Sequence, residues 1–120
     1  AFIPVTHSVP DATAIAFETS EGVVVHTGDF KLDPTPIDGV ITDLQSFAGF
    51  GRRGVRLLLA DSTNAELPGV VDSEKTVGVR IAELVHEAEG RVLIACFASH
   101  LHRVQQSIDA VVADGRKFDA

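Results

Sequence analysis

The run VRLLLADSTN, residues 55–64, decides the fold because the predicted order of strands and helices changes there. Apart from Arg56, its first part is continuously apolar, which is typical of a buried strand bounded by a turn. This strand delivers the polar residues 61–64 to its carboxyl end. The chain before it is predicted to be a β-meander, and the chain after it to alternate strands and helices. We therefore place a change of architecture near residue 55.

Downstream of this run, helical and strand patterns alternate. A helix is predicted between the N-cap Ser73 and the stop signal Gly90, because one face carries the apolar residues Val77, Ile81, Leu84, Val85 and Ala88. Residues 91–97 are predicted to form another buried strand. A second apolar helical stripe follows and ends at Gly115, and we expect residues 116–120 to begin a further strand. Strand, helix, strand and helix in this order predict an α/β fold with a parallel sheet.

Upstream of the run, the patterns are those of short antiparallel strands. Residues 2–5 form one predicted strand, and residues 12–19 and 23–26 are predicted to pair as a hairpin around a Ser-Glu-Gly turn. Residues 31–39 contain two Pro and two Asp and are predicted to be a loop. A short helix is expected over residues 43–50, closed by the glycine that follows it.

Composition excludes several functions. The chain has 10 basic and 17 acidic residues and a formal charge of −7, so its general surface is not built to bind nucleic acid. The single Cys96 excludes an internal disulfide and a cysteine-based zinc cluster, and its apolar neighbours predict a buried thiol. No apolar run has the length of a membrane span and no signal peptide is seen, so we expect a cytoplasmic protein. The chain begins with Ala1 and contains no Met, so we expect a segment cut from inside a domain.

Four polar clusters follow the apolar segments, at residues 6–8, 27–29, 61–64 and 98–100. The ends of strands are where α/β folds usually build ligand sites. His7 and Asp29 suit zinc, because neutral imidazole and carboxylate are good ligands and a carboxylate can bridge two ions. Judged by residue type alone, His7 would more commonly be an ordinary loop residue and Asp29 a turn residue. Asp61 would more commonly cap a turn. No G-x-S-x-G elbow or glycine-rich phosphate loop is present, so a serine hydrolase and a nucleotide-binding fold lack support.

The four clusters, taken in order, resemble the motifs of one family. VTHSVPD at residues 5–11 is similar to the histidine motif of the ribonuclease J family, which has a metallo-β-lactamase fold and a β-CASP region. HTGDFK at 26–31 resembles the later aspartate motif of that fold. DSTNAE at 61–66 resembles the acidic motif that opens the β-CASP region, and FASHLHRVQQ at 97–106 resembles the β-CASP segment that meets the RNA backbone. The resemblance covers nearly the whole chain.

The resemblance implies a division of the fold. Residues 1–60 would be the C-terminal part of a metallo-β-lactamase-like αββα core, including its β-meander. Residues 61–120 would be the start of a β-CASP α/β domain with a parallel sheet. The chain would then be an internal fragment of a longer protein.

The resemblance also implies roles for individual residues. His7 would be a ligand of one zinc ion, and Asp29 would bridge two. Asp61 would help to orient a catalytic histidine that lies outside this chain. The predicted contacts to RNA phosphate or sugar are Ala98, Ser99 and His100. The family pattern leads us to expect Asn at the last of these positions, where histidine still offers a donor.

The implied activity is metal-assisted hydrolysis of RNA, from 5′ ends and also internally, in RNA maturation and decay. The implied partner is RNA, and no association with a membrane is expected. The full-length protein is expected to form a homo-oligomer, either a dimer or a tetramer. The family's main zinc motif, H-x-H-x-D-H, is absent, and residues 100–104 do not replace it. We therefore expect this segment alone to be inactive and to bind zinc weakly.

Two other hypotheses stay open. One is a non-catalytic paralogue or interaction domain that keeps the fold without metal. The other is a different metallo-β-lactamase-fold hydrolase, acting on DNA or on a small ester or thioester. The stretch from residue 61 to residue 103 argues against a small substrate, because in this resemblance it belongs to the nucleic-acid-binding region.

Overall fold

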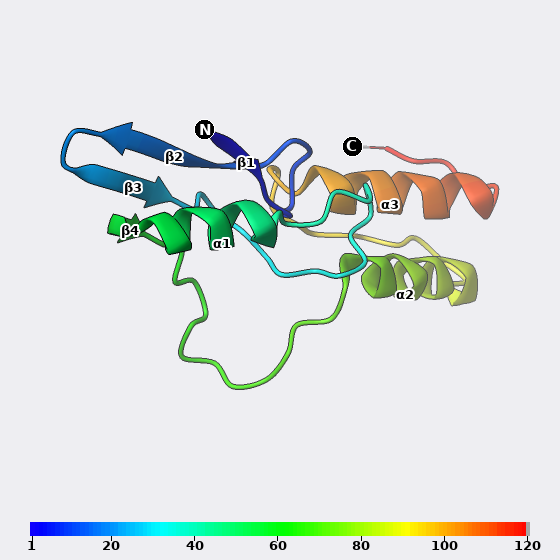
Figure 1. Cartoon of the computed structure of the whole chain (residues 1–120). Coiled ribbons are helices and arrows are strands. Elements are labelled where there is room, and N and C mark those ends of the chain that lie inside the picture. Colours follow the sequence, from blue (N-terminus) through cyan, green and yellow to red (C-terminus); the bar gives the residue numbers. More distant parts are fainter. Residues whose placement is uncertain (120) are drawn as a thin grey trace.

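The structure is a computed structural model that describes residues 1–119. It is a mixed α/β fold with one four-stranded sheet and three helices (Figure 1). The strands lie in the sheet in sequence order: β1 (Phe2–Pro4), β2 (Thr13–Thr19), β3 (Gly22–His26) and β4 (Val55–Leu59). The first three strands are antiparallel, and β4 runs parallel to β3. The predicted meander and hairpin are thus confirmed.

Alternation of side chains builds the first core. Ala14 and Ala16 on β2 are buried, as are Val23 and Val25 on β3, because successive residues of a strand point to opposite faces. Antiparallel pairing sets Ala16 opposite Val25. Ile3, Val5 and Phe50 complete this cluster.

Helix α1 (Leu44–Arg53) supplies Phe50 to that core. It begins at the N-cap Asp43, whose carboxylate accepts hydrogen bonds from the amide and hydroxyl of Ser46 at 3.0 and 2.6 Å. The prediction that Gly51 closes this helix is wrong. Helix interiors accept a glycine at a modest cost. The chain turns out of the helix at Gly54, whose φ of 91° few other residues adopt.

Strand β4 is formed as predicted, but the prediction that it is buried is wrong. All five of its residues are exposed, because no layer covers this edge of the sheet in residues 1–119. The apolar run of residues 55–60 therefore predicted the strand correctly but not its exposure to solvent.

The second part of the described chain is a helix pair. Helices α2 (Glu74–Glu87) and α3 (Leu101–Ala113) pack through Val85, Ala110 and Val111, a core that shares no residue with the first. Their predicted positions are confirmed, with Ser73 as the N-cap of α2. Helix α2 ends at Glu87, just before the predicted stop. None of the helices in residues 1–119 is long and apolar enough to cross a membrane.

The predicted strand over residues 91–97 is wrong. This segment runs between α2 and α3 and pairs with no strand in the described part of the chain, so its backbone has no ladder to join. Leu93 and Phe97 are 88% and 83% exposed, and Cys96 is exposed rather than buried. Residues 116–119 also form no strand, and the prediction for residue 120 lies outside the described residues. The parallel sheet expected after residue 60 is therefore not formed by residues 61–119, and the only parallel pair among the described strands is β3 with β4.

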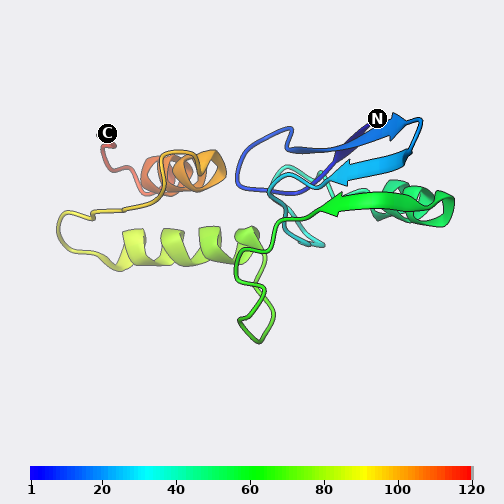
Figure 2. The same cartoon turned by 90° about the vertical axis from the view of Figure 1, so that its left-hand side faces the viewer.

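The molecule is elongated, with extents of 62 × 28 × 21 Å. Figure 2 shows the sheet with α1 at one end and the pair α2 and α3 at the other. The loops that follow β1, β3 and β4 reach the region between them. The division into two domains at residue 60 stays a prediction, although β4 belongs to the sheet of the first part.

Candidate active site

One groove of about 540 Å³ lies where the loops of the sheet meet the start of α3. All four polar clusters that the sequence singled out contribute to it. The residues of those clusters that line it include His7, Asp29, Asp61, Ser99 and His100. Ala98 is exposed next to this groove but does not line it.

The pairing of two loops brings His7 and Asp29 together. Thr6 and Lys31 form an isolated antiparallel bridge, in which the Lys31 amide donates to the Thr6 carbonyl at 2.7 Å. The Thr6 amide in turn donates to the hydroxyl of Thr42 at 3.0 Å. Next to this bridge, His7 Nε2 lies 3.8 Å from Asp29 Oδ2. The two side chains are 34% and 78% exposed, so both remain available to a ligand.

The turn that carries Asp29 depends on a glycine. Gly28 has a φ of +62°, and a Cβ added there would lie 3.2 Å from the Thr13 carbonyl oxygen. Thr27 anchors the other side of the turn, because its amide donates to the Leu59 carbonyl at 3.0 Å. The Thr27 hydroxyl also accepts from the amide of Asp61 at 2.9 Å. The parallel strands β3 and β4 therefore deliver their carboxyl-end aspartates to the same place.

Asp61 is held as a carboxylate by backbone donors. The amide of Thr63 donates to Oδ1 at 2.9 Å, and the amide of Phe30 donates to Oδ2 at 3.3 Å. These contacts, led by that from Thr63 and with a smaller contribution from the charge of His7, lower the pKa of Asp61 below its ordinary value. Both oxygens thus accept hydrogen bonds from the loops that flank the groove.

His100 forms the opposite wall as the N-cap of α3. Its Nδ1 accepts the amide hydrogen of Arg103 at 3.3 Å. Burial lowers the pKa of His100, which favours the neutral ring. In a neutral ring with an accepting Nδ1, the proton is on Nε2. His100 is therefore suited to donate a hydrogen bond from Nε2, while Ser99 offers a hydroxyl beside it.

The donor chemistry of His7 and Asp29 fits a divalent cation such as zinc. Zinc normally takes three or four protein ligands. Within residues 1–119, no group of three His, Cys, Asp or Glu side chains is arranged to hold a metal ion. The pair therefore fits as part of a ligand set, and the remaining ligands would have to come from elsewhere in the protein.

Sequence reasoning assigned no role to four further polar residues of the groove. Lys31, Asp33, Glu74 and His102 also line it. The side chain of Asp33 is 1% exposed. Its carboxylate accepts hydrogen bonds from the amides of Thr35 at 2.9 Å and Glu74 at 3.1 Å. The sequence around Asp33 shows only an aspartate in a proline-rich loop. Its role could not be predicted from that loop, because the second donor to its carboxylate lies 41 residues away.

Fold and groove together define a mixed α/β segment with a histidine–carboxylate site at the ends of its strands. No protein-family profile matches the chain. Among curated proteins it is 54% identical to "Ribonuclease J" of Mycobacterium tuberculosis over 97% of its length. It is 49% identical to that of Thermus thermophilus over 93%, and 45% identical to that of Helicobacter pylori (strain J99) over 98%.

The chain is a homologue of ribonucleases J over nearly its whole length, as the resemblance of its four motifs predicted. It spans about a fifth of the length of these relatives, with 21% of the Mycobacterium tuberculosis protein and 17% of the Helicobacter pylori protein covered.

Proposed function

We propose that the protein carrying this chain is a metal-dependent ribonuclease that hydrolyses phosphodiester bonds of RNA. One observation carries the proposal: His7 and Asp29, from separate loops, lie 3.8 Å apart in a groove that also holds Asp61, Ser99 and His100. The relatives, named ribonucleases J, support RNA as the substrate.

In this proposal, His7 and Asp29 would hold the metal, His7 as a ligand of one zinc ion and Asp29 as a ligand shared by two. Bound divalent ions would supply Lewis-acid activation of a water molecule and of the scissile phosphate. The chain's own residues orient these parts. The amides of Thr63 and Phe30 favour the charged form of Asp61. In this proposal, that carboxylate would help to orient a catalytic histidine from another segment.

The opposite wall would hold RNA. Ser99 and His100 face the groove with a hydroxyl and a ring donor, and the exposed Ala98 lies in the same turn. The four carboxylates that line the groove, Asp29, Asp33, Asp61 and Glu74, would repel a phosphate backbone. Cations at His7 and Asp29 would reverse that local field, which reconciles an acidic chain with a nucleic-acid substrate.

We further propose that cleavage proceeds from RNA 5′ ends, with internal cleavage as a second mode, in RNA maturation and decay. A cytoplasmic homo-oligomer, a dimer or tetramer, is the expected form of the whole protein. An H-x-H-x-D-H motif before this segment and a further histidine after it would support the nuclease. An intact gene that lacks both would instead support the non-catalytic paralogue.

The test compares His7→Ala and Asp29→Asn in the protein that carries this chain. Zinc content and decay of 5′-monophosphorylated RNA are measured together. Each variant should lose metal and slow RNA decay by more than about 100-fold, because losing a ligand disturbs both the activated water and the charge clamp.

The matched controls are His86→Ala and Asp109→Asn, which change exposed residues on α2 and α3 that do not line the groove. Both should behave as the unmodified protein. Full activity in His7→Ala or Asp29→Asn would refute the role assigned to that residue.

A further inference from the structure

We propose that Glu74 is a positioning residue that, together with Arg103, holds the ring of His100 for RNA binding. The inference rests on the proposed function, because it assumes that His100 contacts RNA. It assigns a role in the site to a residue of α2 that neither the four motifs nor the comparisons identify.

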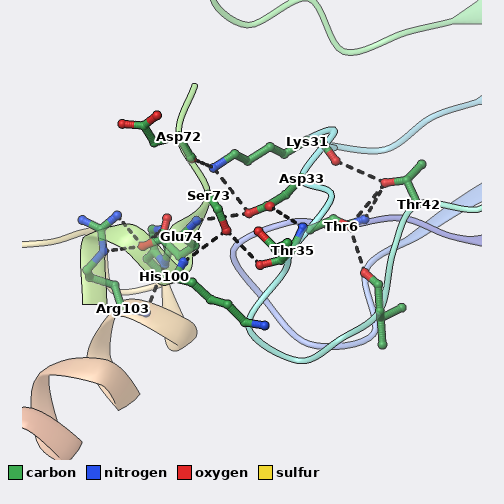
Figure 3. Close-up of polar contacts among 12 residues, drawn as sticks. Thr6, Lys31, Asp33, Thr35, Thr42, Asp72, Ser73, Glu74, His100 and Arg103 are labelled. Atoms are coloured by element: carbon green, nitrogen blue, oxygen red, sulfur yellow. Dashed lines mark hydrogen bonds and ion pairs between the residues drawn. The ribbon is translucent and has the colours of Figure 1, made fainter. Parts of the chain in front are cut away.

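The carboxylate of Glu74 is the centre of a charged cluster (Figure 3). Its Oε1 accepts from Nε of Arg103 at 2.5 Å and lies 2.5 Å from Nη2 of the same side chain. The same oxygen lies 3.7 Å from His100 Nε2. The Glu74 side chain is only 16% exposed, so solvent screens these interactions less than at an open surface.

The backbone of Glu74 is fixed from two directions. Its amide donates to Asp33 Oδ2 at 3.1 Å, and its carbonyl accepts from Nε2 of Gln106 at 2.9 Å. The Gln106 amide passes directly over Gly78, where any Cβ would collide with it. Glu74 therefore joins the loop that continues from Asp29 to the first turns of α3.

This arrangement determines how His100 is presented. Nδ1 of His100 is occupied by the amide of Arg103, which leaves Nε2 as the ring donor. Nε2 faces the Glu74 carboxylate, which attracts the proton there. The guanidinium of Arg103 forms an ion pair with the same carboxylate, so the ring of His100 lies beside a pair whose charges cancel. Without the carboxylate, the Arg103 side chain loses its ion-pair partner and Nε2 of His100 loses the negative charge that faces it, so only the Arg103 amide at Nδ1 still orients the ring.

The effect should appear in substrate binding more than in the chemical step. Among the described residues, no hydrogen bond or ion pair joins Glu74 to His7, Asp29 or Asp61, so Glu74→Gln should leave kcat within about twofold. KM for RNA should rise about tenfold, which corresponds to the loss of one charge-assisted hydrogen bond. The matched control is Glu83→Gln on the same helix, where the carboxylate pairs only with the exposed Arg80.

Steady-state kinetics on 5′-monophosphorylated RNA would be measured in the protein that carries this chain. A second measurement uses long-range ¹H–¹⁵N spectra of histidine-labelled protein, in which the wild-type His100 ring should show the Nε2–H tautomer. Glu74→Gln should replace that signature with a tautomer mixture, and Glu83→Gln should not. If Glu74→Gln does not fold, Arg103→Lys, which keeps the charge and loses the forked contact, should give the same change.

The His100→Asn background separates positioning from general damage. There, Glu74→Gln should raise KM by no more than about twofold, because the residue on which it acts is gone. A full increase in that background, or an unchanged KM in the single variant, overturns the inference. If the wild-type protein does not cleave RNA, the proposed function fails by itself. The ring spectrum then still tests the positioning, and an unchanged His100 signature in Glu74→Gln overturns it.

Discussion

The buried carboxylate of Asp33 accepts a hydrogen bond from the backbone amide of Glu74 at 3.1 Å and thereby caps the start of α2 from another part of the chain. The same carboxylate accepts from the Thr35 amide, and Lys31 Nζ lies 3.8 Å from it. Burial raises the pKa of Asp33, but the amides of Thr35 and Glu74 outweigh this and leave the pKa below its ordinary value.

We predict that Asp33→Asn lowers the free energy of unfolding by about 1.5–3 kcal/mol at neutral pH, the usual worth of hydrogen bonds to a charged group. Because the folded-state pKa is lowered, the stabilisation is fully present above the unfolded value of about 3.9 and is lost as the pH falls through the folded value. Denaturant unfolding from pH 7 to pH 3 should therefore show wild type and variant converging in acid. The exposed Asp109→Asn is the control, and a constant gap between wild type and Asp33→Asn would contradict the capping role.

Gly28→Ala should destabilise the chain by about 1–2 kcal/mol, because its φ of +62° is a left-handed conformation that Cβ disfavours. The new methyl group would also press on the Thr13 carbonyl oxygen. Thermal unfolding measures the cost. Gly49→Ala inside α1 is the control, since its Cβ would meet nothing within 4 Å and should stabilise the helix by up to about 1 kcal/mol. Equal effects at the two glycines would argue against strain at the Asp29 turn.

Asp61→Asn should lower kcat roughly 10- to 100-fold, the usual range when a group that orients a metal-site residue is changed. Zinc content should stay near that of wild type, because Asp61 is not assigned as a ligand. Metal analysis alongside RNA-decay kinetics tests both statements, with the exposed Asp72→Asn as control. Loss of zinc in Asp61→Asn would instead make Asp61 a ligand.

Chelation should abolish RNA decay by the protein that carries this chain, and added zinc should restore it. Metal content should fall as the pH is lowered, because imidazole and carboxylate must be deprotonated to bind metal. Residues 1–120 alone should bind zinc weakly in a calorimetric titration, since His7 and Asp29 are fewer than the three or four ligands of a stable site. Tight binding by the isolated segment would show that the ligand set assigned here is wrong.

Local patterns predicted the parts of the fold that local physics determines. The hairpin of β2 and β3 followed from a Gly-containing turn between apolar runs, and α2 and α3 followed from their apolar stripes. The burial of β4 and the strand at residues 91–97 were predicted wrongly for one shared reason. An apolar run favours a strand, but the neighbouring structure decides whether that strand forms and is buried. Within residues 1–119, β4 pairs with β3 but has no covering layer, and residues 91–97 have no partner strand.

The candidate site, too, could be predicted only in part. The residue types of His7, Asp29 and Asp61 at strand ends predicted a shared location, and the structure brings them to one groove. Their roles with metal and RNA stay predictions. Asp33 and Glu74 could not be predicted, because their contact joins residues far apart in the chain and leaves no periodic trace in the sequence.

The two apolar cores share no residue, and the contacts between them that involve Asp33, Glu74 and Lys31 are polar. The groove thus lies between the sheet and the helix pair, and not inside either core. The two walls of the groove can separate while both cores stay packed, at the expense of the hydrogen bonds that join them. How firmly the two walls of the groove face each other therefore depends on these few polar contacts and not on how well either core is packed.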